Sequence, residues 1–118
     1  MRKLLALLLL SATPVVAQHR PQDMPIHEMF YNTWMMPDNR AMSCCHKKDC
    51  QPAASKFENG QWWARWEDMP KDQWWAIPAK KVETDRDTPD GRSHMCGRKG
   101  GGFAPQFTVY CFIPGGGA

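Results

Sequence analysis

Three of the five cysteines of this chain lie within one short segment, Ser43-Cys44-Cys45-His46-Lys47-Lys48-Asp49-Cys50. Thiols at this density either oxidise to disulfides or hold a metal ion. The remaining two cysteines, Cys96 and Cys111, lie far along the chain, so a bond to either of them closes a long loop. Any fold of this chain must therefore provide disulfide partners or a metal ion for the clustered cysteines.

The first 17 residues have the pattern of a cleaved signal peptide. Arg2 and Lys3 precede an apolar run over residues 4–10, and small residues follow at 15–17. The run is far shorter than the roughly 20 residues that cross a bilayer as a helix. We predict cleavage after Ala17, a periplasmic or secreted product, and no membrane span after signal cleavage.

The charge balance argues against a nucleic-acid partner. The chain has 15 basic and 12 acidic residues, a net charge of +3, and two of the positive charges are Arg2 and Lys3. The other charges alternate in sign and form no basic patch, so we expect no nucleic-acid binding. The alternating charges of Glu83-Thr84-Asp85-Arg86-Asp87 are interpreted as a solvated surface, and residues 84–91 as a charged loop.

The composition indicates that the fold needs covalent cross-links between its elements. No leucine follows the predicted cleavage site, and the apolar side chains there are chiefly aromatic, including all six tryptophans. Such a chain has difficulty offsetting its ordering entropy by burial alone. Disulfides persist in oxidising compartments, so composition and export together predict one small disulfide-rich domain over residues 18–118.

Periodicity predicts one helix followed by strands. A helix over 25–35, ended by Pro37, is indicated by apolar residues at three- and four-residue steps: Ile26, Met29, Phe30, Thr33 and Trp34. The Asn59-Gly60 pair predicts a hairpin whose return strand is 62–66. Further strands are expected at 74–77, 92–96 and 106–113, the last with one apolar face: Phe107, Val109, Cys111 and Ile113. The predicted fold class is α+β, a small antiparallel β-sheet of about five strands with one N-terminal helix, stabilised by disulfides.

Several short segments together form a recognisable pattern, which resembles that of uncharacterised small secreted proteins from alphaproteobacteria and their phages. The resemblance implies an exported domain and no particular activity, and it carries over no catalytic residue. The segments are Phe30-Tyr31, Trp34, Pro37, Cys44-Cys45, Asp49-Cys50-Gln51-Pro52, Trp75-Ala76-Ile77-Pro78, Pro89-Asp90-Gly91-Arg92-Ser93-His94-Met95-Cys96 and Cys111-Phe112-Ile113-Pro114.

The cysteines are best interpreted as disulfides. Five is an odd number, so two disulfides leave one thiol, or one cysteine pairs between chains. Cys44 and Cys45 are adjacent and point to opposite sides of an extended segment, so each is able to reach a different element. The preferred arrangement joins the cluster to both C-terminal strands. The candidates are Cys44, Cys45, Cys50, Cys96 and Cys111, with the fifth left open.

A metal site is the alternative interpretation of the same residues. Thiolate and imidazole ligands suit zinc or copper(I), and the candidate set is Cys45, His46, Cys50, His94 and Cys96. Their spacing departs from the usual pairs separated by two residues, and an oxidising compartment competes for the thiols. We therefore predict no cofactor.

The tryptophans indicate a ligand-binding surface. Strand alternation places Trp63 and Arg65 on the face opposite Trp62 and Trp66, and the adjacent pair Trp74-Trp75 adds one ring to each face. Exposed rings in an exported protein suggest contacts with sugars or with a protein. The predicted binding residues are Trp63, Arg65, Trp74 and Trp75. The alternative is that all six tryptophans are core.

The sequence contains no nucleophile–base motif, phosphate-binding glycine loop or paired-carboxylate signature. We therefore expect a binding or interaction module of unknown ligand, an envelope glycan or a protein partner, more readily than an enzyme. The alternative is a periplasmic protein that handles zinc or copper. A hydrolase would require a cleft lined by histidine and carboxylates.

Overall fold

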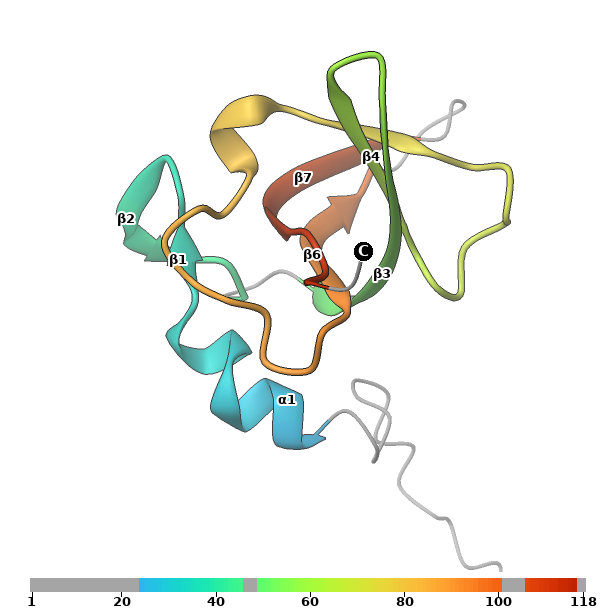
Figure 1. The fold of residues 1–118 in the computed structure, drawn as a ribbon. Coiled ribbons are helices and arrows are strands. Elements are labelled where there is room, and N and C mark those ends of the chain that lie inside the picture. Colours follow the sequence, from blue (N-terminus) through green and yellow to red (C-terminus); the bar gives the residue numbers. More distant parts are fainter. Residues whose placement is uncertain (1–23, 46–48, 101–105, 117–118) are drawn as a thin grey trace, which may run out of the picture.

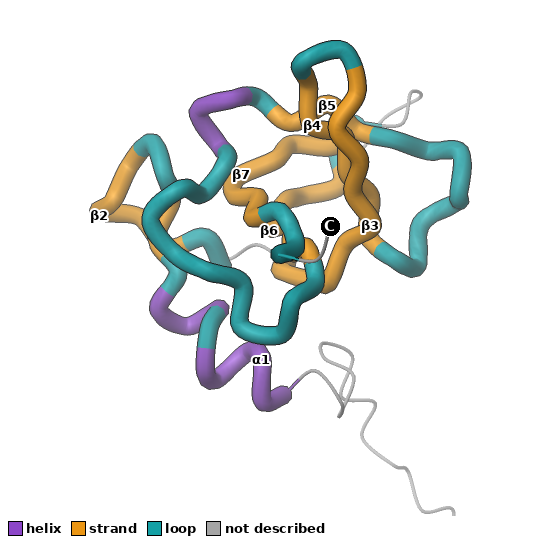
Figure 2. The backbone as a smooth tube through the Cα atoms, viewed as in Figure 1, coloured by secondary structure: helices purple, strands orange, loops and turns teal. Residues whose placement is uncertain are grey.

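The computed structural model describes residues 24–45, 49–100 and 106–116, so the predicted signal peptide lies outside the described residues. Seven strands form two antiparallel sheets (Figures 1 and 2). The smaller sheet pairs β1 (Met35–Met36) with β2 (Asn39–Ser43). The larger sheet has the strand order β5-β4-β3-β6-β7, made by β3 (Asp49–Glu58), β4 (Gln61–Trp66), β5 (Trp75–Ile77), β6 (Ser93–Lys99) and β7 (Phe107–Ile113).

The predicted α+β class is wrong, because the described part of the chain is mostly β. The helix α1 (Met24–Met29) has six residues, and only the 3-10 turns η2 (Tyr31–Thr33) and η3 (Ala79–Lys81) accompany it. The apolar stripe fails as a helix because the carbonyl of Trp34 accepts a hydrogen bond from the Cys44 N–H, at 2.8 Å, and the chain continues as β1. No helix among the described residues is long and apolar enough to cross a membrane.

The turn between β3 and β4 sets the register of that hairpin. Asn59 and Gly60 have φ angles of 54° and 71°, the left-handed values that a two-residue type I′ turn requires. Glu58 consequently pairs with Gln61, and Lys56 lies directly opposite Trp63. The Asn-Gly pair thus determines which side chains of β3 and β4 share a face.

The larger sheet curls until the chain after β5 reaches β7. Val82 forms a bridge to Phe112, and the Glu83 N–H donates to the Phe112 carbonyl at 2.7 Å. Across the interior, the ring of Trp66 in β4 lies edge-on to Phe107 in β7, with centroids 4.9 Å apart. We call the enclosed core the inner cluster; it consists of Ala53, Ala64, Trp66, Met69, Ile77, Met95, Val109 and Phe112.

The segment formed by α1, η2, β1 and β2 packs on the outer face of the same sheet, over β6 and β7 (Figure 1). Because both faces of β6 are covered, the strand is buried from Ser93 to Gly97. The second core, called here the N-terminal cluster, consists of Phe30, Tyr31, Trp34, Met36, Cys44, Cys50, Cys96, Cys111 and Ile113.

A register shift in β7 corrects the predicted apolar face of that strand. Cys96 pairs with Cys111, but the next residue of β6, Gly97, pairs with Val109, which leaves Tyr110 as the extra residue of a bulge. The alternation changes phase at this point. Val109 therefore belongs to the inner cluster, while Cys111 belongs to the N-terminal cluster on the other face.

Two disulfides hold the outer face together, as predicted. Cys50 in β3 is bonded to Cys96, the residue directly opposite in β6. Cys44, which follows β2, is bonded to Cys111 in β7. Cys45 is the free cysteine. The protein is a small disulfide-stabilised domain, and these bonds indicate an oxidising, extracytoplasmic environment.

Peptide mapping under non-reducing conditions should find the Cys44–Cys111 and Cys50–Cys96 pairs, with Cys45 alone open to alkylation. The pairs are separated by 67 and 46 residues. In the chain-entropy model each bond stabilises the fold by about 4 kcal/mol, so the Cys44→Ser/Cys111→Ser variant should unfold at a much lower urea concentration. Cys45→Ser is the matched control and should leave the transition in place. A map in which Cys45 is bonded would contradict the arrangement.

Candidate functional site

The outer face of the sheet is covered over β6 and β7 but not over β4. Lys56, Trp63, Arg65 and Trp74 lie on this uncovered part, which we call the tryptophan face. Lys56 and Trp63 are cross-strand partners, and Arg65 is two residues further along β4. Ala76 of β5 lies opposite Trp63 on the other side and is exposed. The small side chain of Ala76 therefore leaves the Trp63 indole accessible from that side.

Two cations lie close to the Trp74 ring. Lys56 Nζ lies 4.6 Å from the centre of the Trp74 ring, and Arg65 Cζ lies 5.3 Å from it. Both distances are within the range of a cation–π interaction. Trp63, Arg65 and Trp74 are each partly exposed. The tryptophan face is therefore a shallow surface on which partly exposed indole rings lie beside positive charges.

Trp75, the fourth predicted binding residue, lies on the other face. It pairs with Ala64, whose side chain is in the inner cluster, and its ring is 5.6 Å from that of Phe107. Lys56, in contrast, was not predicted as a binding residue. The signal was present in the sequence, because counting back from the Asn59-Gly60 turn places Lys56 opposite Trp63.

Three residues of the alternative metal site are engaged in other bonds, and a fourth, Cys45, is a free thiol. Cys50 and Cys96 are joined to each other, and both ring nitrogens of His94 lie in hydrogen bonds to protein groups. His46 lies outside the described residues. Among the residues that are described, no group of three or more His, Cys, Asp or Glu side chains is placed to hold a metal ion.

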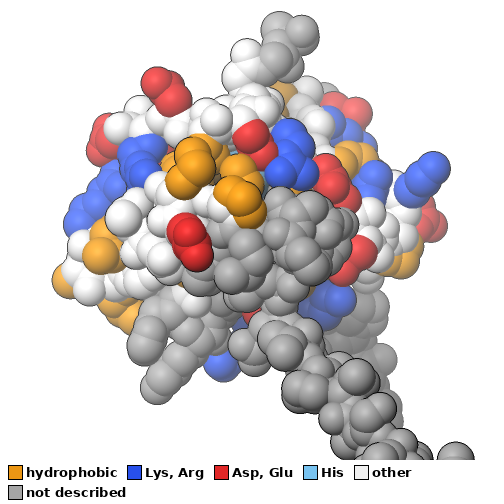
Figure 3. Space-filling model, turned by 90° about the horizontal axis from the view of Figure 1, so that it is seen from below, with side chains coloured by type: hydrophobic (Ala, Val, Ile, Leu, Met, Phe, Trp, Pro, Cys, Tyr) orange, Lys and Arg blue, Asp and Glu red, His pale blue; other side chains and the backbone are white. Residues whose placement is uncertain are grey.

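An open pocket of about 700 Å³ lies between the loop 86–92 and the tail 113–116. Its charged lining residues are of both signs, and Figure 3, which views the molecule from the side of α1, shows a surface of similarly mixed sign. Arg86 is stacked on the ring of Phe30, with Cζ 4.4 Å from the centroid. The described residues that line this pocket include no histidine.

Behind the pocket wall, His94 forms a buried chain with Tyr31 and Asp90. The Tyr31 hydroxyl donates to Nδ1 and the Nε2–H donates to Asp90 Oδ1, both at 2.7 Å. Burial lowers the pKa of His94 below 6.5, so the ring is neutral at pH 7. Burial alone would raise the pKa of Asp90, but hydrogen bonds from His94 and Arg92 outweigh it and lower that pKa to about 2. Tyr31 and His94 are fully enclosed, so this chain links α1 and η2 to β6 and is a structural contact.

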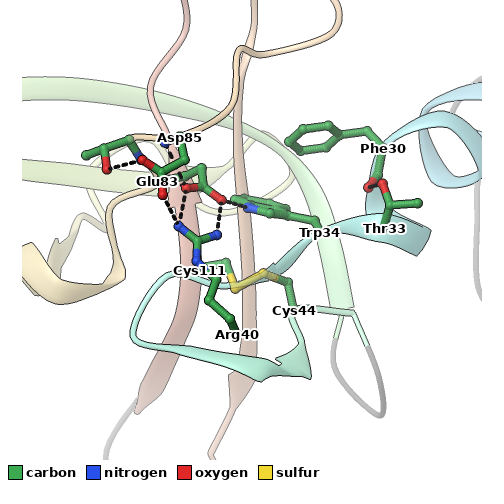
Figure 4. Close-up of polar contacts among 9 residues, drawn as sticks. Phe30, Thr33, Trp34, Arg40, Cys44, Glu83, Asp85 and Cys111 are labelled. Atoms are coloured by element: carbon green, nitrogen blue, oxygen red, sulfur yellow. Dashed lines mark hydrogen bonds and ion pairs between the residues drawn. A yellow bond between two sulfur atoms is a disulfide. The ribbon is translucent and has the colours of Figure 1, made fainter.

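The carboxylate of Glu83 is buried. The interpretation of the charged stretch 83–87 as a solvated surface is therefore wrong for this residue. Its side chain is 0% exposed and lies between Trp34 and Arg40, beside the Cys44–Cys111 disulfide (Figure 4). Trp34 Nε1 and Arg40 Nη1 donate to Oε1, each at 3.0 Å. Arg40 Nη2 and the backbone N–H groups of Thr84 and Asp85 donate to Oε2. Burial alone would raise the pKa of Glu83. The hydrogen bonds lower it by a larger amount, so the net pKa lies below its usual value.

Replacing Glu83 by glutamine should destabilise the protein by about 2 kcal/mol. The amide offers donors where the carboxylate accepts, so buried N–H groups of Trp34 and the loop lose partners. Equilibrium unfolding in urea measures the change. Asp85→Asn is the control, because Asp85 pairs with the same Arg40 but its side chain is 73% exposed, and its effect should be much smaller. Equal effects of the two substitutions would contradict the assigned role of Glu83.

The free energy of unfolding should fall in two stages as the solution is acidified. The folded-state pKa of His94 is depressed, so its stabilising contribution is present above pH 6.5 and is lost as pH falls through the folded value. The depressed pKa values of Glu83 and Asp90 act in the same direction in the second stage, which begins below pH 4.5 for Glu83 and extends from pH 3.8 to about 2 for Asp90. Urea titrations at a series of pH values measure both stages. His94→Gln should abolish the first stage only, and an unchanged slope below pH 6.5 in this variant would refute the assignment.

No family model, curated protein or solved structure matches this chain. The function therefore has to be inferred from the geometry of its own residues.

Proposed function

We propose that this protein is an exported binding module, with the tryptophan face as its binding surface and an envelope glycan as its ligand. A signal-peptide pattern over residues 1–17 supports export to the periplasm or the cell exterior. The two disulfides support the same compartment, because such bonds persist where thiols are oxidised.

One observation carries the proposal. The outer face of a single sheet is packed against the N-terminal cluster over β6 and β7, yet it carries partly exposed indole rings over β4. Trp63 and Trp74 are not needed to fill either core, because both clusters are assembled without them. Large aromatic surface left accessible in this way is typical of a site of interaction.

The shape and composition of the surface favour a saccharide. The face is the outer side of the curled sheet, and the pocket of about 700 Å³ is lined by other parts of the chain. A sugar presents C–H groups on its ring face and hydroxyls at its edge, which complement an indole face beside Lys56 and Arg65. A peptide that adds to a sheet requires a free strand edge, whereas Trp63 projects from β4, which is paired with β3 on one side and β5 on the other.

The surface is also rigid, which lowers the entropic cost of binding. Trp63 sits on a β4 that pairs with both β3 and β5. Trp74 is fixed by Lys56 and Arg65 before any ligand arrives. Groups that are already ordered lose little freedom when a ligand binds them.

Trp63→Ala and Trp74→Ala should each weaken binding to chitotetraose, a neutral aminosugar tetramer, by about five- to tenfold, because each removes one stacking ring. Isothermal titration calorimetry on the full exported chain measures the affinity. The control is Phe57→Ala, which removes a 58% exposed ring from the inner-face side of the same hairpin. The proposal fails if the tryptophan variants bind as the unchanged protein does.

A further inference from the structure

The tryptophan face contains a positive charge that no acid of the described residues neutralises. Arg65 Nη1 donates to the backbone carbonyls of Trp66 and Met69, at 3.4 and 3.3 Å. Arg65 Nε is buried and has no hydrogen-bond partner among the described residues. A partly buried guanidinium without an anionic partner is costly, and the cost is recovered when an anion binds.

Two other arginines, Arg40 and Arg92, are paired with acids. Arg40 forms a two-pronged contact with Glu83, and Arg92 Nε lies 2.6 Å from Asp90 Oδ2. At these two positions the chain itself supplies the acidic partner. Arg65 differs in that its fixed side chain projects onto a face whose rings are accessible.

Lys56 adds a second positive charge on the same face. Its Nζ lies 3.4 Å from Glu58 Oε2, a pair in which both side chains are substantially exposed. An exposed pair of this kind contributes little to stability, so Lys56 exchanges Glu58 for another carboxylate at low cost. With Arg65 and Lys56 both close to the Trp74 ring, the charge of the face is complementary to an anion.

We propose that the ligand of the tryptophan face is an acidic saccharide whose carboxylate is bound by Arg65, with Lys56 as the second cation. This inference rests on the proposed function and names the chemical class of its ligand. A sugar ring stacks on Trp63, and a carboxylate at the edge of that ring or the next one reaches the guanidinium. Planar, fixed donors make arginine suited to binding carboxylates, and the solvent-accessible part of the partly exposed Arg65 guanidinium faces the ligand.

The test compares three tetrasaccharides by calorimetry. Chitotetraose is neutral, the peptide-free tetramer of alternating N-acetylglucosamine and N-acetylmuramic acid carries lactyl ether carboxylates, and tetragalacturonate carries carboxylates on its rings. We expect at least one acidic probe to bind on the order of tenfold more tightly than chitotetraose. The two acidic probes separate the lactyl from the uronic source of the carboxylate.

Arg65→Gln should weaken binding of the acidic probe on the order of tenfold more than it weakens binding of chitotetraose, and so remove the preference. The charge-matched control, Lys80→Gln, removes a positive charge from η3 and should keep the preference. If Arg65→Gln does not fold, Lys56→Gln and salt replace it. Raising the salt from about 0.05 to about 0.5 M should weaken binding of the acidic probe selectively.

The outcomes separate the inference from the function on which it rests. Equal affinity for neutral and acidic probes, with both dependent on Trp63, overturns the inference and leaves the proposed function standing. Failure of all three saccharides to bind overturns both. Binding of an oligoglutamate peptide in place of the saccharides, abolished by Trp63→Ala, also overturns both and assigns the face to an acidic protein segment.

Discussion

A row of three cysteines across adjacent strands is the constraint on which the rest of the structure depends. Cys50, Cys96 and Cys111 lie side by side on β3, β6 and β7, because Cys96 is the direct partner of both neighbours. One bond closes within the row and the other leads to Cys44. The segment of α1, η2, β1 and β2 is thereby fixed over one half of the outer face. The other half, over β4, stays free for a ligand.

The polar contacts under this segment act together with the covalent ones. Glu83 joins Trp34 and Arg40 to the end of β7, and His94 joins Tyr31 to the loop that carries Asp90. Each carboxylate is saturated by donors, so each satisfies the requirement that a buried charge be paired. This chain has few aliphatic side chains and therefore little apolar contact area. Hydrogen bonds and ion pairs between the segment of α1, η2, β1 and β2 and the larger sheet replace part of it.

Local signals predicted the parts of the fold that local chemistry determines. The Asn59-Gly60 turn, the strands around Trp63 and Val109, and the bonding of the cysteine cluster to Cys96 and Cys111 were all accessible from the sequence. The helix over 25–35 was wrong because Trp34 turns inward toward Glu83, a partner 49 residues away. The face of β7 was wrong because no local signal marks Tyr110 as a bulge. The sequence predicted that Trp63, Arg65 and one ring of the 74–75 pair share a face. Lys56 can be assigned to this face only when the register of the β3–β4 hairpin is known.

The free thiol of Cys45 affects how the disulfides of the unfolded chain form. Four cysteines allow three pairings, and the choice of the one left out multiplies the number of isomers by five. Cys45 is the immediate neighbour of Cys44, so either of them is able to form a bond to Cys111 if oxidation precedes folding. Only the native choice lets Cys44 enter the core, where it is fully buried, and leaves its neighbour partly exposed. Burial raises the pKa of the Cys45 thiol, so once folding is complete this group reacts slowly with the neighbouring bonds. The same thiol that allows reshuffling in the unfolded chain is thus quiescent in the native one, which makes maturation dependent on thiol exchange and the finished product resistant to it.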